Sequence, residues 1–432
     1  MIWLGVIVLL LLMLLGAPLY AVIAAAAMLG FWAGDIDLTV LAIEIYRIAD
    51  TPLLIALPLF TFVGYVLSAA RTSERLVALT QALLGWMPAG LAVVALLTCA
   101  FFTALTGASG VTIVALGALL YPALLQGKYP ERFSLGLVTS SGSLGLLLAP
   151  SVPLILYGVV AQQLDLGQPI EINHLFLAGI FPALLMVGLL GLYSAFVGRR
   201  AGVSRQAFSV RVALAALWAA RWELPLPVIV LGGVFGGFFA VSEAAAVTAV
   251  YVLIAEVLLY RDVKLAQLPG LMREAMVMVG GILLILAVSL AFTNFLVDAE
   301  VPQQLFTLVQ SAIQSKWAFL ILLNIGLLVL GAMLDIFAAI VIMVPLILPV
   351  AVGYGIHPIH LGIIFLANMQ IGYFTPPIGM NLFIASFRFR RSIAELSLAC
   401  VPFILVLLFA LALITYVPAI SLALVPEAAL SP

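Results

Sequence analysis

The chain has 432 residues, of which 66% are hydrophobic and only 8% are charged. Soluble globular domains carry roughly 45–50% apolar and about 25% charged residues, so this composition excludes a soluble protein and a soluble enzyme. A net charge of −1 provides no basic surface for a nucleic acid. Apolar runs continue unbroken along the chain, whereas the strands of membrane barrels alternate apolar and polar residues. The composition predicts a helical protein that crosses the lipid bilayer many times.

The predicted spans begin with the apolar run 1–33, which is too long for one crossing because about 20 residues span a bilayer. Gly16, Ala17 and Pro18 interrupt it and predict two short helices. The run lacks a basic amino-terminal region and a cleavage site, so we expect it to be retained. Residues 35–50 mix acidic and apolar side chains, which predicts a helix in the membrane interface. Further spans are predicted at residues 51–70, 133–161, 175–198, 224–240, 242–260, 276–297, 361–387 and 396–417.

Two other apolar runs, residues 90–121 and 317–352, do not fit a single crossing. The first is interrupted by the sequence TGASG at residues 106–110, and the second is interrupted near residues 331–335. Each predicts a re-entrant hairpin that enters the membrane, turns and leaves on the same side. Non-helical backbone at that depth is tolerated only where protein buries it or it lines a wet cavity.

The basic residues support this topology. With the N-terminus outside and both runs as hairpins, only Arg47 and Lys316 fall outside, which leaves 15 of the 17 lysines and arginines on the inner side. Cytoplasmic loops carry such an excess. Making either hairpin a single crossing reverses every later segment and loses the bias. The topology places both termini outside.

The two hairpins have matching sequence contexts. Each is followed by a span broken at a proline, with 43 residues from Gly107 to Pro150 and 45 from Gly331 to Pro376. The topology gives the two halves opposite directions. Inverted repeats with discontinuous helices at matching positions indicate the binding site of a secondary transporter. A single Gly or Pro break is usually a packing kink, but four breaks in two matched pairs favour a functional site.

Asp335 stands at the predicted tip of the second hairpin, with no basic residue nearby in the sequence. An ionised carboxylate at the bilayer centre costs at least about 2.5–3.5 kcal/mol, so we expect Asp335 to face a cation, water or a polar cavity. It also suits the cap of the hairpin's second helix, and the two roles are compatible. The matching position of the first hairpin is Val111, so the hairpins are not chemically equal.

Other polar residues cluster at the breaks. Such residues either hold helices together or form a hydrophilic pocket, and their grouping favours a pocket. The substrate-pocket candidates are Thr106, Ser109, Thr112, Ser151, Asp335, Thr375 and Asn381. Glu243, after Ser242 at the start of a span, is a further candidate, although an acid there also serves helix initiation.

The sequence contains no HExxH, GxSxG or GxxxxGK[ST] pattern, so neither catalysis nor ATP hydrolysis is predicted. His357 and His360 have no Cys, Asp or Glu beside them, and no transition-metal site is predicted there. Residues 208–221 predict a basic amphipathic helix on the cytoplasmic surface.

Five segments together resemble the large membrane subunit of tripartite ATP-independent periplasmic (TRAP) transporters. They are GASG at 107–110, SGSLGLLLAPSVPLILYG at 141–158, SEAAA at 242–246, EVPQQ at 300–304 and GYFTPPIGMNLF at 372–383. Two segments depart from the family: residues 149–151 read APS where the family often has PPS, and residues 240–243 read AVSE where it commonly has TPTE. Neither departure removes a backbone carbonyl.

The resemblance implies an elevator-type fold related to other ion transporters, with Na⁺-coupled uptake of a small organic anion such as a dicarboxylate or sialic acid. It also implies a small four-helix membrane subunit, a periplasmic substrate-binding protein, no organic cofactor, and a bacterial inner membrane with both termini periplasmic. Because the predicted pocket offers no Lys or Arg, Na⁺ is suited to neutralise the anion. The family's Na⁺ sites lie where each hairpin meets its broken helix, which implies one site at Gly107, Ser109, Gly145, Leu148 and Pro150 and another at Gly331, Asp335, Gly372, Thr375 and Pro376.

The same resemblance divides the chain into two repeats. Residues 1–70 form scaffold helices and an interfacial arm, 71–165 the first half of the transport domain, 166–297 the scaffold of the second repeat with its amphipathic connector, 298–391 the second half of the transport domain, and 392–432 a C-terminal helix and tail. The main alternative function is a Na⁺/carboxylate symporter that needs no binding protein. An ion channel and a membrane enzyme are less consistent with these motifs.

Overall fold

The computed structural model describes residues 5, 7–9, 11, 12, 15–48, 51–87, 89–164, 170–203 and 207–426. These residues form helices and turns, and none of them forms a strand. Eight of the described helices are long and apolar enough to cross a membrane, and a bent pair would add a ninth. The predicted polytopic helical protein is therefore confirmed. The short helix predicted before Gly16 lies partly outside the described residues.

The first half of the chain contains the first hairpin and the first broken helix. Its elements are α2 (Leu19–Ala33), α3 (Thr39–Arg47), the 3₁₀ turn η2 (Pro52–Ile55), α4 (Ala56–Ala69), α5 (Thr72–Leu84), α6 (Gly90–Thr106), α7 (Ser109–Gln126), α8 (Glu131–Ser141), the 3₁₀ turn η3 (Leu144–Leu147), α9 (Val152–Gln162), α10 (Ile172–Arg200) and α11 (Val210–Ala219).

The second half repeats this order from α15 onward. Its elements are α12 (Pro225–Pro227), the π-helical segment η4 (Val228–Gly232), α13 (Gly233–Phe235), α14 (Val241–Leu253), the π-helical segment η5 (Ile254–Leu259), the 3₁₀ turn η6 (Leu265–Gln267), α15 (Leu268–Asp298), α16 (Val301–Ala312), α17 (Lys316–Met333), α18 (Ile336–Gly353), α19 (Pro358–Gly372), α20 (Met380–Phe389), α21 (Ile393–Tyr416) and α22 (Ala419–Leu422).

Both apolar runs that were predicted to form hairpins fold back on themselves as two helices joined by a turn, and the outer ends of each pair come back together. α6 turns into α7 at Gly107 and Ala108, and α17 turns into α18 at Leu334 and Asp335. In the second hairpin Lys316 Nζ, at the start of α17, donates to the carbonyl oxygen of Gly355 just beyond α18, over 2.7 Å. In the first, α7 ends beside the beginning of α6. Each pair of helices therefore starts and finishes at the same end of the molecule.

Both predicted broken helices are also present. The segment formed by α8 and η3 meets α9 at 42°, across residues 148–151. In the second repeat α19 stops at Gly372 and α20 starts at Met380. Each break contains one cis X–Pro bond, Ala149–Pro150 in the first and Pro376–Pro377 in the second.

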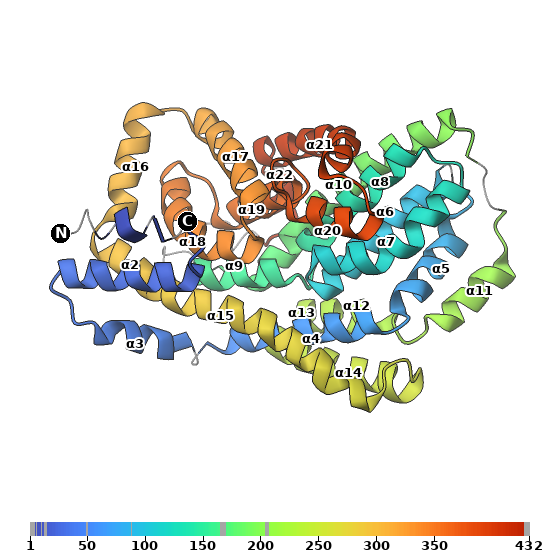
Figure 1. The fold of residues 1–432 in the computed structure, drawn as a ribbon, viewed down its shortest axis with the longest axis horizontal. Coiled ribbons are helices and arrows are strands. Elements are labelled where there is room, and N and C mark those ends of the chain that lie inside the picture. The colour runs from blue at the N-terminus through green and yellow to red at the C-terminus, as the bar shows by residue number, and fades with distance from the viewer. Residues whose placement is uncertain are drawn as a thin grey trace.

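The helices form two layers (Figure 1). A scaffold layer of α2, α3, α4, α14 and α15 runs along the lower side of the view, below a hairpin layer made of α6–α9 and α17–α20. The two hairpins enter the hairpin layer from opposite ends, so that their tips meet near the middle. α10 belongs to the segment 166–297, which was predicted to be part of the scaffold. It packs against α6 and α19 of the hairpin layer and against α21.

Two predicted spans differ from the sequence expectations. The span predicted at 224–240 is helical only from Pro225 to Phe235, which is ~16 Å at 1.5 Å per residue and shorter than a bilayer core. It ends at Gly236 and Gly237, and Gly237 has a φ of 71°. α15 begins at Leu268, before the predicted start of its span at residue 276.

Two helices were not predicted from the sequence, α5 and α16. Each connects a scaffold helix to a hairpin, so the two occupy matching places in the repeats. α5 is held at its N-terminal end by Arg75, which forms ion pairs with Glu223, Glu256 at 3.0 Å and Asp262 at 2.6 Å. Burial lowers the pKa of Arg75, but the hydrogen bond to Asp262 and the nearby charges of Glu223 and Glu256 outweigh burial and raise the pKa above its ordinary value.

The second hairpin packs closely on the second broken helix because two glycines face each other. A Cβ atom on Gly372 would lie 2.6 Å from the carbonyl carbon of Gly331, so α17 and α19 approach backbone to backbone. Beyond the contact, the Gly379 amide donates to the carbonyl oxygen of Ala332 over 2.9 Å. Small residues permit such close helix contacts in membranes.

We expect Gly372→Ala to separate α19 from α17, because an added methyl group has no space there. Overpacking typically costs about 1–3 kcal/mol, which predicts a lower thermal unfolding midpoint for the detergent-solubilised protein. Gly326→Ala is the matched control, since a Cβ on this α17 glycine meets nothing within 4 Å. Equal midpoints for the two variants would contradict the proposed contact.

Candidate functional site

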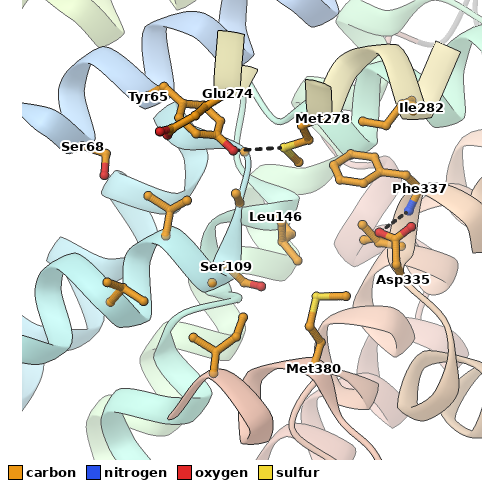
Figure 2. Close-up of a pocket in the computed structure, with 18 of the residues that line it drawn as sticks. Tyr65, Ser68, Ser109, Leu146, Glu274, Met278, Ile282, Asp335, Phe337 and Met380 are labelled. Atoms are coloured by element: carbon orange, nitrogen blue, oxygen red, sulfur yellow. Dashed lines mark hydrogen bonds between the residues drawn. The ribbon is translucent and has the colours of Figure 1, made fainter. Parts of the chain in front are cut away.

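A cavity of about 810 Å³ lies between the scaffold layer and the hairpin layer. The tips of both hairpins line one side, through Gly107–Gly110 and Asp335–Phe337, and α4 and α15 line the other. Figure 2 shows Ser109 and Asp335 pointing into this space from different hairpins, opposite Tyr65 and Glu274. The site thus combines both repeats with the scaffold layer.

The tip of the first hairpin is a two-residue turn. Gly107 has a φ of 68°, which favours glycine, and a Cβ there would lie 2.8 Å from the Val152 side chain. Behind the tip, the Thr103 hydroxyl lies 2.6 Å from that of Thr112 and donates to the carbonyl oxygen of Gly142 over 2.7 Å. These bonds attach both arms of the hairpin to the first broken helix.

The tip of the second hairpin is built around Asp335. Its two carboxylate oxygens accept hydrogen bonds from the amides of Phe337 at 3.2 Å and Ala338 at 3.1 Å, and Figure 2 shows the carboxylate beside Phe337. The Tyr373 hydroxyl lies near this carboxylate and accepts a hydrogen bond from the Ile336 amide over 2.7 Å. The expected capping role is therefore observed, and the same carboxylate lines the cavity.

A side-chain hydrogen bond joins the two repeats beside the first hairpin tip. The hydroxyl of Ser109, at the first hairpin tip, donates to Asn381 Oδ1 at the start of α20, over 2.8 Å. Both residues are buried. Asn381 Nδ2 and the Thr106 hydroxyl have no hydrogen-bond partner among the described residues, although both are buried close to the breaks.

The sequence candidates separate into lining and supporting residues. Among them Gly107, Ser109 and Asp335 line the cavity. Ser151 instead donates to the carbonyl oxygen of Leu146 over 2.6 Å, and Thr375 to that of Ile371 over 2.8 Å. The candidates outside the described lining are Thr106, Thr112, Gly145, Leu148, Pro150, Ser151, Gly331, Gly372, Thr375, Pro376 and Asn381.

Two of these supporting residues and Glu243 have clear local roles. Gly145 packs against the backbone of α6 at Ala100, and Gly372 packs against Gly331. The Glu243 carboxylate accepts from the Ala240 amide over 2.9 Å at the start of α14. Glu243 thus initiates a helix and is not among the residues lining the cavity.

The sequence analysis missed the scaffold wall of the cavity. Tyr65 and Ser68 on α4, and Glu274 and Met278 on α15, line this wall, and the Tyr65 hydroxyl lies 3.9 Å from Met278 Sδ. Helical spacing puts Glu274, Met278 and Ile282 on one face. Glu274 was missed because the predicted span started only at residue 276.

The charges at the cavity have one sign. Among its described lining residues, Glu274 and Asp335 are acidic and none is Lys, Arg or His. Most of the remaining lining is aliphatic or aromatic. Within the described ranges, no group of three or more His, Cys, Asp or Glu side chains is arranged to hold a metal ion.

Comparison with known proteins places this geometry in a family. Residues 6–420 match the family model of the tripartite ATP-independent periplasmic transporter, DctM component. The C4-dicarboxylate TRAP transporter large permease protein of Rhodobacter capsulatus is 34% identical, with 91% of each chain covered. The ectoine/5-hydroxyectoine TRAP transporter large permease protein of Ruegeria pomeroyi is 30% identical, with 95% of each chain covered.

A solved structure is similar in fold. The YdaH transporter of Alcanivorax borkumensis superposes with a TM-score of 0.64 at 17% identity, over 90% of this chain and 89% of that one. The relatives are transporter permeases and not enzymes. Together with the matched family model, they show that this chain belongs to the large permease subunits of the tripartite ATP-independent periplasmic transporters.

Proposed function

We propose that the chain carries out Na⁺-coupled uptake of a small organic acid across the bacterial inner membrane, with C4-dicarboxylates as the first candidates. A periplasmic binding protein delivers the substrate, and a small membrane subunit completes the transporter. The observation that carries the proposal is the cavity between the two layers, lined by the tips of two opposed hairpins. Membership of the family supports the two partners.

The charge of the cavity supports coupling to a cation. Since its described lining holds two carboxylates and no cationic side chain, an organic anion entering alone meets no compensating charge. Broken membrane helices offer backbone carbonyls and half-helix ends that coordinate Na⁺ and anions. We place the ions at the two hairpin–break junctions, where Gly107 and Ser109 belong to one junction and Asp335 to the other. Each net positive charge that moves inward releases ~2.3 kcal/mol of free energy per 100 mV of transmembrane potential.

The position of the cavity supports an elevator movement and an inward-facing state. Its scaffold wall uses the last turns of α4 and the first half of α15, and both adjoin the basic residues of the predicted cytoplasmic side. Farther along α15, Leu286 and Ser289 pack near Val341 and Pro345 around a space of only about 10 Å³. The hairpin layer would carry the substrate by sliding along the scaffold layer until the outer side opens.

The same orientation supports periplasmic termini. The Arg71 amide and the Arg75 guanidinium both bond Asp262, which follows Arg261 in the chain. Arg47 and Lys316 belong to helices at the other end of the molecule. An excess of basic residues marks the cytoplasmic side. α11 adds Arg211 to the basic end.

The tripartite arrangement can be tested in liposomes under an inward Na⁺ gradient. We expect the complete complex to accumulate an organic acid only when its binding protein is present, because the binding protein supplies the substrate. A thermal-shift screen of the binding protein against succinate, pyruvate and sialic acid identifies the acid. Accumulation by the chain alone would favour the stand-alone symporter, and accumulation without a Na⁺ gradient would contradict Na⁺ coupling.

The role of Asp335 can be tested by removing its charge while keeping an oxygen that caps α18. We expect Asp335→Asn to raise the Na⁺ concentration for half-maximal uptake about tenfold, which corresponds to ~1.4 kcal/mol of lost ion binding. Glu243→Gln is the matched control, because it also removes a carboxylate at a helix start while keeping a capping oxygen. Unchanged Na⁺ dependence in Asp335→Asn would rule out the ion-binding role.

A further inference from the structure

We propose that Glu274 determines how readily the substrate leaves the cavity toward the cytoplasm, by repelling an anion that faces it. This inference rests on the proposed function, since it requires an anionic substrate and an inward-facing cavity. It assigns a role to a residue on the scaffold wall, away from the hairpin–break junctions.

Glu274 lies at the opening of the cavity. The cytoplasmic mouth is formed by Ser68 and Ala69 from the last turn of α4 and by Leu271 and Glu274 from the first turns of α15. Ala69 and Glu274 are exposed there. Figure 2 shows Glu274 beside Tyr65, on the side of the cavity away from Asp335. A substrate released from the hairpin tips toward this mouth therefore passes the Glu274 carboxylate.

The Glu274 carboxylate has no ion-pair partner among the described residues. Arg75, on the nearby helix α5, is already bonded to three carboxylates. Arg273 precedes Glu274 on the helix, and successive helical residues point about 100° apart. Among the four residues named at the mouth, Glu274 is the charged one, so the side chains that line the mouth present a negative charge to the cavity.

The location of this charge in the scaffold layer gives it a directional effect. Asp335 and Ser109 belong to the hairpin layer and would travel with the substrate, whereas Glu274 would stay in place. An anion at the hairpin tips faces Glu274 when the cavity adjoins the cytoplasmic mouth, and moves away from it when the tips slide outward. The repulsion therefore weakens substrate binding selectively in the inward-facing state, which favours release and hinders rebinding.

The inference predicts a change in affinity on one side of the membrane. The complete transporter is reconstituted in one orientation, and entry of radiolabelled succinate, pyruvate and sialic acid is measured from each side. We expect Glu274→Gln to lower the half-saturating concentration on the cytoplasmic side about fivefold, within the usual range of coupling energies, and to leave the periplasmic value unchanged. Accumulated substrate should then slow further uptake by the variant more than by the wild type.

Two further variants separate charge from shape and position. Glu274→Asp keeps the charge and should behave as the wild type. Glu74→Gln removes an exposed acid from α5 at the same end of the molecule but outside the cavity lining, and should change neither value. Equal effects of Glu274→Asp and Glu274→Gln would overturn the electrostatic role, as would an unchanged cytoplasmic value in Glu274→Gln.

The wild type separates this inference from the proposed function. If it transports at least one of the three acids but Glu274→Gln has the same cytoplasmic affinity for that acid, only the inference is overturned. If the wild-type complex transports none of the three acids, the proposed function is overturned together with the inference. If Glu274→Gln binds more tightly on the cytoplasmic side alone, the inference is supported.

Discussion

Lipid cannot satisfy the backbone groups that a broken helix exposes, and this constraint explains how the two repeats are placed. Each break lies against another part of the protein. Ser109 at the first hairpin tip bonds Asn381 of the second broken helix, and the Gly379 amide bonds Ala332 of the second hairpin. The breaks therefore support one another at the centre of the molecule, beside the cavity. Non-helical backbone within a membrane is tolerated only in such protected positions.

The groups that satisfy the backbone are also the groups available to a substrate. The Asp335 carboxylate accepts hydrogen bonds from two amides of α18, yet it lines the cavity. A carboxylate fixed by several hydrogen bonds stays ionised at lower cost than a free one in an apolar setting. Capping is therefore compatible with the proposed ion binding, because the cap bonds hold the charge where a cation would need it.

The sequence predicts the breaks and the hairpins well because local chemistry determines them. Gly107, Pro150 and Pro376 interrupt apolar runs whose length is limited by the bilayer, and the structure breaks at each. The direction of a side chain around a helix near such a break depends on tertiary packing, so Thr112 was predicted to line the pocket but bonds Thr103 behind it. Glu274 belongs to the scaffold wall, which only the meeting of α4 and α15 defines.

The two repeats match in the order of their helices but not in their chemistry. At the hairpin tips, Asp335 in the second repeat has Val111 as its counterpart in the first, and both line the cavity. At the connecting helices, α5 is held by the Arg75 ion pairs, whereas no ion pair holds α16 among the described residues. A buried ionic cluster contributes little net stability but fixes one arrangement of its partners. The ionic cluster thus fixes the position of α5 in the first repeat, while the second repeat carries the carboxylate at its hairpin tip, so the two repeats differ in chemistry at matching positions.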